Sequence, residues 1–186
     1  MYRWIAAVVL GLMLNTTYAE GQQALPNESG DTAQRLRGYF LDAARRGDQA
    51  MLDEFIKAGY DLNVHDDKGY TGLILAAYHG QRDAVEQLLA AGADPCAQDL
   101  HGNTALMGAV FKGEVRIAQR LLNAPCSPDQ RNASGQTAAM YAALFHRQEL
   151  LEALKAQGAD LNATDALGNS AQSLSRGEIN GVKPGN

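Results

Sequence analysis

Histidines are the side chains of this 186-residue chain best suited to metal binding or acid–base chemistry. A helical metal site needs ligands at set spacings, such as two histidines four residues apart, and none of these histidines has that spacing. His65 and His101 fall in consecutive turn segments, where we expect solvated side chains. We therefore predict no metal site at the four histidines, which are His65, His79, His101 and His146.

Sequence motifs of catalysis are missing as well. The chain has no G-x-S-x-G motif, no Walker sequence and no glycine-rich dinucleotide fingerprint. Its net charge of −5 at pH 7 argues against a nucleic-acid partner, because phosphate binding requires a clustered positive surface. We therefore predict that the chain is not an enzyme, carries no cofactor and binds no nucleic acid.

Residues 1–19 are typical of a secretory signal peptide. Arg3 supplies a positive start, residues 4–14 are apolar except for Gly11, and Thr17 and Ala19 are small residues before a cleavage point. The apolar stretch is too short to span a bilayer. We expect cleavage after Ala19, a periplasmic or secreted chain and no membrane attachment afterwards. The alternative is an uncleaved N-terminal anchor.

A period of 33 residues organises the rest of the chain. Glycines recur at this interval, and each is followed two residues later by a small hydroxyl residue. A pair of small residues and a leucine pair recur in the same register, as do Gly-Ala-Asp sequences at 92–94 and 158–160. The recurring glycines are Gly69, Gly102, Gly135 and Gly168, and the hydroxyl residues are Thr71, Thr104, Thr137 and Ser170. Such a period is typical of a repeat protein.

Each period has a direct physical interpretation. The glycine provides the positive φ of a tight turn, and the hydroxyl residue is placed to cap a short helix. A pair such as Ala76-Ala77 keeps that helix thin, and Gly80 ends it. A second helix follows with apolar residues at helical spacing, as at Val85, Leu88 and Leu89. One unit cannot bury its apolar face alone, so the units must stack.

The pattern from Gly69-Tyr70-Thr71-Gly72-Leu73 through Gly92-Ala93-Asp94 resembles the ankyrin repeat. The resemblance implies an all-α solenoid of stacked helix-turn-helix units with projecting β-turn loops. Where the family has Thr-Pro-Leu-His, this chain lacks the proline and the histidine, and His146 replaces the third glycine of the Gly80 series. We expect modest local stability, weakest in the third repeat. The domain covers 34–176, as an N-terminal cap (34–65), repeats 66–98, 99–131 and 132–164, and a C-terminal cap (165–176).

The flanks of this domain have the composition of unstructured segments. Residues 20–33 are rich in Gln, Gly, Pro, Asn and Ser, which indicates a flexible linker. Residues 177–186 have no apolar period, which indicates a flexible tail.

Cys96 and Cys126 lie in the loops that end the first two full repeats. An exported chain meets an oxidising compartment, where an even number of cysteines favours pairing. A bridge would close a loop of about 30 residues, worth on the order of 3 kcal/mol. Equivalent points of neighbouring repeats are too far apart for a disulfide unless the three-residue offset compensates, so two unpaired thiols stay the alternative.

The resemblance implies that a partner protein binds the concave side, formed by turn tips and the exposed positions of the first helices. One column at these positions is Tyr78, Phe111 and Leu144, with Phe145 beside it. Large apolar side chains exposed in consecutive repeats indicate an interaction site. The alternative is a shifted register, in which these side chains pack between repeats. The predicted partner-binding residues are Tyr70, Tyr78, His79, His101, Asn103, Phe111, Lys112, Leu144 and Phe145.

Our hypothesis is a non-catalytic ankyrin-repeat module in the periplasm, monomeric when unbound, that binds one protein. An immunity or inhibitor protein that covers a toxin or hydrolase is one version. An accessory factor is another, since support of a periplasmic enzyme such as a catalase is associated with some similar exported ankyrin proteins. A secreted effector is the third.

Overall fold

The computed structural model describes residues 28–181 and divides the chain into two compact units, Met1–Ala33 and Gln34–Asn186. The described residues of the first unit are the first residues of helix α1. No helix within residues 28–181 is long and apolar enough to cross a membrane. The helices of this range are α1 (Glu28–Arg46), α2 (Gln49–Lys57), α3 (Gly72–Tyr78), α4 (Arg82–Ala90), α5 (Ala105–Lys112), α6 (Val115–Leu122), α7 (Ala138–Leu144), α8 (Gln148–Ala156) and α9 (Ala171–Ser175).

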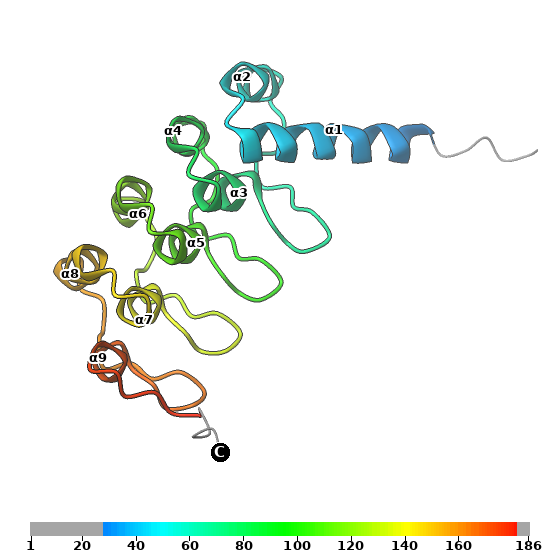
Figure 1. Ribbon diagram of the computed structural model, residues 1–186. Coiled ribbons are helices and arrows are strands. Elements are labelled where there is room, and N and C mark those ends of the chain that lie inside the picture. Colours follow the sequence, from blue (N-terminus) through cyan, green and yellow to red (C-terminus); the bar gives the residue numbers. More distant parts are fainter. Residues whose placement is uncertain (1–27, 182–186) are drawn as a thin grey trace, which may run out of the picture. The chain divides into compact units, whose positions relative to one another are not determined.

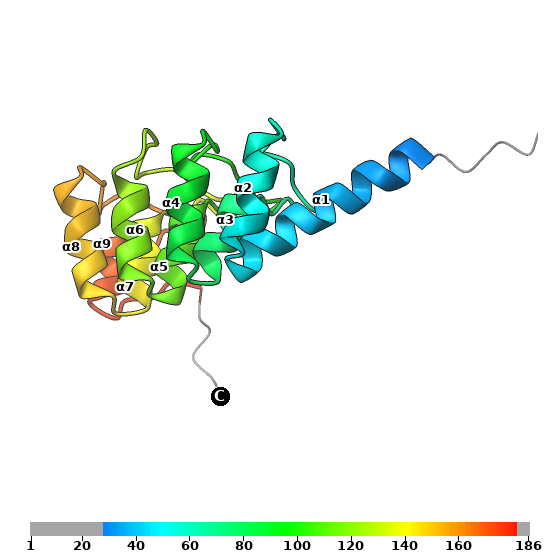
Figure 2. The ribbon, with the colours of Figure 1, turned by 90° about the horizontal axis from the view of Figure 1, so that it is seen from above.

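Helix pairs of the second unit stack side by side in two rows (Figure 1). We call α3, α5, α7 and α9 the inner row, and α2, α4, α6 and α8 the outer row. A loop projects before each inner-row helix, and Figure 2 shows the outer-row helices lying next to one another. Over residues 28–181 the backbone forms isolated bridges but no strand. The predicted all-α solenoid with projecting turns is therefore confirmed.

Hydroxyl side chains begin the inner-row helices. The oxygen of each of these residues accepts a hydrogen bond from the backbone N–H three residues later, at 3.0–3.4 Å. Such a cap contributes about 1 kcal/mol, because it satisfies an N–H that has no partner inside the helix. The capping residues are Thr71, Thr104, Thr137 and Ser170.

Small residues let the inner-row helices approach one another. The pairs Ala76-Ala77, Ala109-Val110 and Ala142-Ala143 are at most 2% exposed. Gly72, at the position of the missing proline, has a specific neighbour: a Cβ there would lie 2.9 Å from Cε1 of Phe40. The buried Phe40 ring of the N-terminal cap therefore occupies the space that a larger residue would need.

Backbone hydrogen bonds connect the projecting hairpins. The hairpins are residues 65–71, 98–104, 131–137 and 164–170. The N–H of Leu100 donates to the Lys68 carbonyl at 3.0 Å, Ala133 N–H to His101 at 2.8 Å and Ala166 N–H to Ser134 at 3.0 Å. Each hairpin thus fixes the position of the next.

A second set of contacts connects the loops that follow the outer-row helices. The Asn63 side chain accepts from Asp94 N–H at 2.8 Å, and the Asp129 side chain accepts from Asp160 N–H at 2.9 Å. At the step between them, Cys96 stands in register with Asn63 and Asp129, and it forms a disulfide with Cys126. Their Cα atoms are 5.5 Å apart, because the separation of 30 residues brings Cys126 opposite Cys96 in the next loop. The bridge takes the place of the hydrogen bond made at the other two steps.

The flanking segments differ from the prediction. Residues 1–19 and the first part of the expected flexible linker 20–33 lie outside the described residues, but 28–33 are helical and form the start of α1. Ala33, Gln34, Arg35 and Leu36 have good helix propensity, which extends α1 beyond the repeat pattern.

The expected flexible tail 177–186 is also corrected over its described part. Asn180 N–H donates to Asn169 Oδ1 at 2.6 Å, and the Asn180 side chain donates to the Gly168 carbonyl at 3.2 Å. Residues 177–181 are thus held on the last hairpin by amide hydrogen bonds, which apolar periodicity does not reveal. The C-terminal cap therefore extends past residue 176.

His146 is the non-glycine residue of the described range with a positive φ, 54°, at the position where Gly80 and Gly113 follow the first helix of the other two full repeats. A side chain costs about 1–2 kcal/mol in this left-handed conformation. We expect His146→Gly to raise the free energy of unfolding by about 1 kcal/mol, measured by urea denaturation. His79→Gly, one position before Gly80, is the control and should destabilise. A lower free energy of unfolding in His146→Gly would show that the positive φ of His146 does not strain the backbone.

Candidate functional site

Four side chains of the inner row form an exposed apolar line, which we call the aromatic strip: Tyr78, Phe111, Leu144 and Phe145. Their exposed fractions are 39%, 40%, 36% and 38%. The rings of Tyr78 and Phe111 lie nearly parallel with centroids 6.2 Å apart, and Phe111 meets Phe145 edge-to-face at 5.0 Å. The structure places these side chains partly exposed at the surface, where the three rings contact one another across three repeats.

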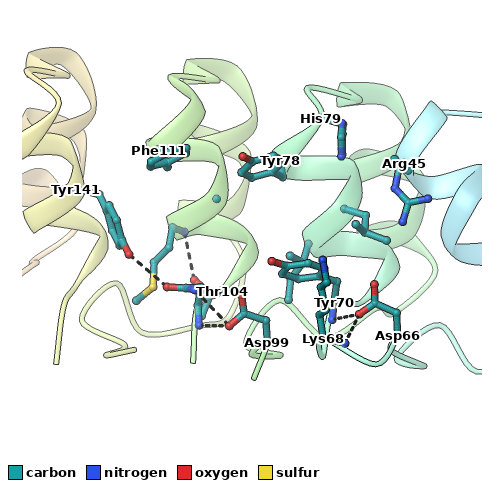
Figure 3. A pocket seen from close by; sticks show the side chains of 15 residues that line it. Arg45, Asp66, Lys68, Tyr70, Tyr78, His79, Asp99, Thr104, Phe111 and Tyr141 are labelled. Atoms are coloured by element: carbon teal, nitrogen blue, oxygen red, sulfur yellow. Dashed lines mark hydrogen bonds between the residues drawn. The ribbon is translucent and has the colours of Figure 1, made fainter. Parts of the chain in front are cut away.

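The aromatic strip borders a groove of about 520 Å³ between the inner row and the hairpins. Figure 3 shows Tyr78 and Phe111 on the helix side of this groove and Asp66, Lys68 and Asp99 on the hairpin side. The lining residues are Arg45, Asp66, Lys68, Tyr70, Ile74, Leu75, Tyr78, His79, Asp99, Asn103, Thr104, Met107, Gly108, Phe111 and Tyr141. Volume and lining are in the range of sites that take a small molecule or a side chain.

The predicted partner-binding residues divide into two groups. Five of them line the groove: Tyr70, Tyr78, His79, Asn103 and Phe111. Four do not line it: Lys112, Leu144 and Phe145 lie further along the helix ends, and His101 is exposed on its hairpin.

Tyr141 is a groove residue that the sequence analysis missed. Its ring is parallel to that of Phe145, with centroids 6.3 Å apart. Four residues separate the two along α7, so helical spacing alone puts them on one face. In the 33-residue register, Tyr141 follows Leu75 and Gly108, so no column of like residues indicates it, and the spacing to Phe145 is the signal that could have found it. Arg45 was missed too, although it precedes Tyr78 by one period.

The Tyr141 hydroxyl is fixed by amide groups. It accepts a hydrogen bond from Asn132 Nδ2 at 3.2 Å and donates one to Gln136 Oε1 at 3.2 Å. Burial raises the pKa of the Tyr141 phenol above its ordinary value, while the hydrogen bond from Asn132 opposes this shift. The hydroxyl therefore stays neutral at physiological pH, and the ring is held at the groove edge.

The carboxylates on the hairpin side accept hydrogen bonds from backbone N–H groups of their own turns. Asp99, 8% exposed, accepts from the N–H groups of His101 and Asn103, both at 2.8 Å. Asp66 accepts from the N–H groups of Lys68 and Tyr70, both at 2.9 Å. These hydrogen bonds hold the turns in the shape that places Tyr70 and Asn103 at the groove.

Gly108 forms the groove surface opposite Tyr78 and lies inside α5. A Cβ added there would lie 3.8 Å from Cβ and Cδ2 of Tyr78, which is ordinary contact. The fold therefore does not require glycine at this position, although glycine costs a helix interior about 1 kcal/mol relative to alanine.

We accordingly expect Gly108→Ala to raise the free energy of unfolding by about 0.5–1 kcal/mol, measured by urea denaturation. A loss of stability would show that the groove surface cannot accept a methyl group. Gly72→Ala is the opposite case and should destabilise, because its Cβ would meet the Phe40 ring.

The lining of the groove suits contacts with another molecule. Within residues 28–181, no group of three or more His, Cys, Asp or Glu side chains is placed to hold a metal ion. The groove instead offers ring faces, an exposed cation and turn amides, which suit contacts with another macromolecule.

A comparison with protein families gives one match. A family model described as ankyrin repeats (3 copies) matches residues 40–132 and 83–165. No match was found among curated proteins. The two matched ranges overlap and together cover the stack from the N-terminal cap to the end of the third full repeat.

Proposed function

Because the chain belongs to the ankyrin-repeat family, we propose that it is a non-catalytic module that binds one partner protein through the aromatic strip and the groove beside it. Ankyrin repeats generally mediate protein–protein interactions, and their stacked units give an extended surface suited to this. The partner is a protein of the compartment in which the chain resides.

The observation that carries this proposal is the exposure of the aromatic strip. These partly exposed rings of consecutive repeats do not belong to the buried core, which is made of Ala, Leu and other apolar side chains. Aromatic side chains dominate the binding energy of interfaces, where a few central residues account for most of the affinity. A protein surface that covers Tyr78, Phe111 and Phe145 would remove this apolar area from water.

We place the chain in the periplasm or outside the cell. The signal-like sequence of residues 1–19 and the Cys96–Cys126 disulfide support this location, because disulfides persist in oxidising compartments. Mass spectrometry of the exported chain is expected to find Glu20 as the first residue. An intact N-terminus on a chain that stays attached to the membrane would instead support the anchor.

We expect Phe111→Ala and Tyr78→Ala to lower the affinity for the partner about tenfold or more, as truncation of central interface residues does. The partner is isolated from periplasmic extract with the unchanged protein, and its affinity for each variant is then measured by calorimetry. Tyr39→Ala is the matched control, since Tyr39 is 62% exposed and does not line the groove. Equal affinity of Phe111→Ala, Tyr78→Ala and the unchanged protein would place the interface elsewhere.

A further inference from the structure

The ends of α1 and of the inner-row helices α3, α5 and α7 carry positive charge, although the whole chain has a net charge of −5. The equivalent segments are 45–48, 78–81, 111–114 and 144–147. They contain four basic side chains and two acidic ones, with His79 and His146 beside them. The basic residues are Arg45, Arg46, Lys112 and Arg147. The aromatic strip therefore lies among cations.

Two of these cations have no carboxylate partner within the described range. The Lys112 amine lies 5.2 Å from the centre of the Tyr78 ring, and no acidic group is within ion-pair distance of it or of the exposed Arg147. Arg45 and Arg46 share one carboxylate, that of Asp42, at 3.4 and 2.9 Å. Part of this charge complements the helix dipoles, but the shared Asp42 leaves one cation in excess at α1.

Within residues 28–181, the carboxylates that line the groove form no ion pair with these cations. Asp66 and Asp99 lie on the hairpin side (Figure 3) and accept hydrogen bonds from their own turns. An arriving segment therefore meets cations and rings on the helix side, and on the hairpin side Lys68 beside two carboxylates that accept hydrogen bonds from their own turns. Negative charge on the segment is favoured along the helix ends.

We propose that the groove takes an acidic segment of the partner protein, with one large apolar side chain over Gly108 and carboxylates directed at Lys112 and Arg45. This inference rests on the proposed function and specifies the chemistry of the partner. The space over Gly108 between Tyr78, Phe111 and Tyr141 accepts the apolar side chain, since Gly108 itself has none. Charge complementarity then sets the position and orientation of the rest of the segment.

Selection of short random peptides displayed on phage tests this proposal with the full chain. Enriched peptides are expected to be rich in Asp and Glu around one Phe, Leu or Trp. The affinity of the most enriched peptide should fall about tenfold in Lys112→Glu/Arg45→Glu and should also fall as salt rises. Gly108→Leu, which fills the space for the apolar side chain, should weaken it similarly.

The matched control reverses two exposed charges on the outer row, Arg116→Glu/Lys155→Glu, and should leave peptide affinity unchanged. Enrichment of basic or uncharged peptides whose binding still requires Phe111 would contradict the acidic segment, while the proposed function would stand. Peptide affinity that is unchanged in Phe111→Ala would overturn both the acidic segment and the proposed function. Tight binding of single-stranded DNA at the same cations would assign them to a nucleic acid and overturn the proposal as well.

Discussion

Reduction of the Cys96–Cys126 disulfide is expected to lower the free energy of unfolding by about 3–4 kcal/mol, which is the chain-entropy value for a loop of this length. The bridge is the covalent contact between the first two full repeats, and it stands where the neighbouring steps each have a hydrogen bond between their loops. Urea denaturation with and without reductant measures the difference.

The variant Cys96→Ser/Cys126→Ser is the control for this experiment. It should have the stability of the reduced protein and should not respond to reductant. Two thiols that react with an alkylating agent in the native, unreduced protein would contradict the bridge. A reductant effect of the same size in the variant would assign the change to something other than this bond.

Gly102→Ala is expected to lower the free energy of unfolding by about 3 kcal/mol, from backbone strain and overpacking together. Gly102 has a φ of 77°, and a Cβ there would lie 2.8 Å from the backbone nitrogen of Ala133 in the next hairpin. Backbone cannot move aside as a flexible side chain can. The hairpin contact between Ala133 N–H and His101 would therefore be pushed apart.

Gly59→Ala separates the two causes of this loss. Gly59 has a φ of 67° but nothing within 4 Å of an added Cβ, so it carries only the conformational cost of about 1 kcal/mol. Urea denaturation of both variants measures the difference that comes from the close hairpin approach. Equal losses would show that this approach does not constrain Gly102.

The solenoid could be predicted from sequence because its causes are local. Gly102 and Thr104 determine a turn and a cap within a few residues, and the 33-residue register repeats them. The helical residues 28–33 and the folded-back residues 177–181 were not predicted. Their order comes from helix propensity and from amide hydrogen bonds that follow no period.

The candidate site could be predicted only in part, because its contacts join side chains of different repeats. Register alone put Tyr78 and Phe111 on the inner surface, but it gave no distance between rings of different repeats. Tyr141 escaped notice because its equivalents are a leucine and a glycine, so no column of like residues marks it. The choice between bridged and unpaired cysteines stayed open because the reach of Cys96 across two loops depends on how closely the repeats stack.

The ring contacts at the groove affect the entropy of association. They join Tyr78, Phe111, Tyr141 and Phe145. Each ring is held by at least one other ring, and Tyr141 by hydrogen bonds as well. Side chains restrained before association lose less rotamer freedom when a partner covers them, which leaves more of the burial energy as affinity. The surface is thus preorganised, and a partner can dock on it as on a rigid template.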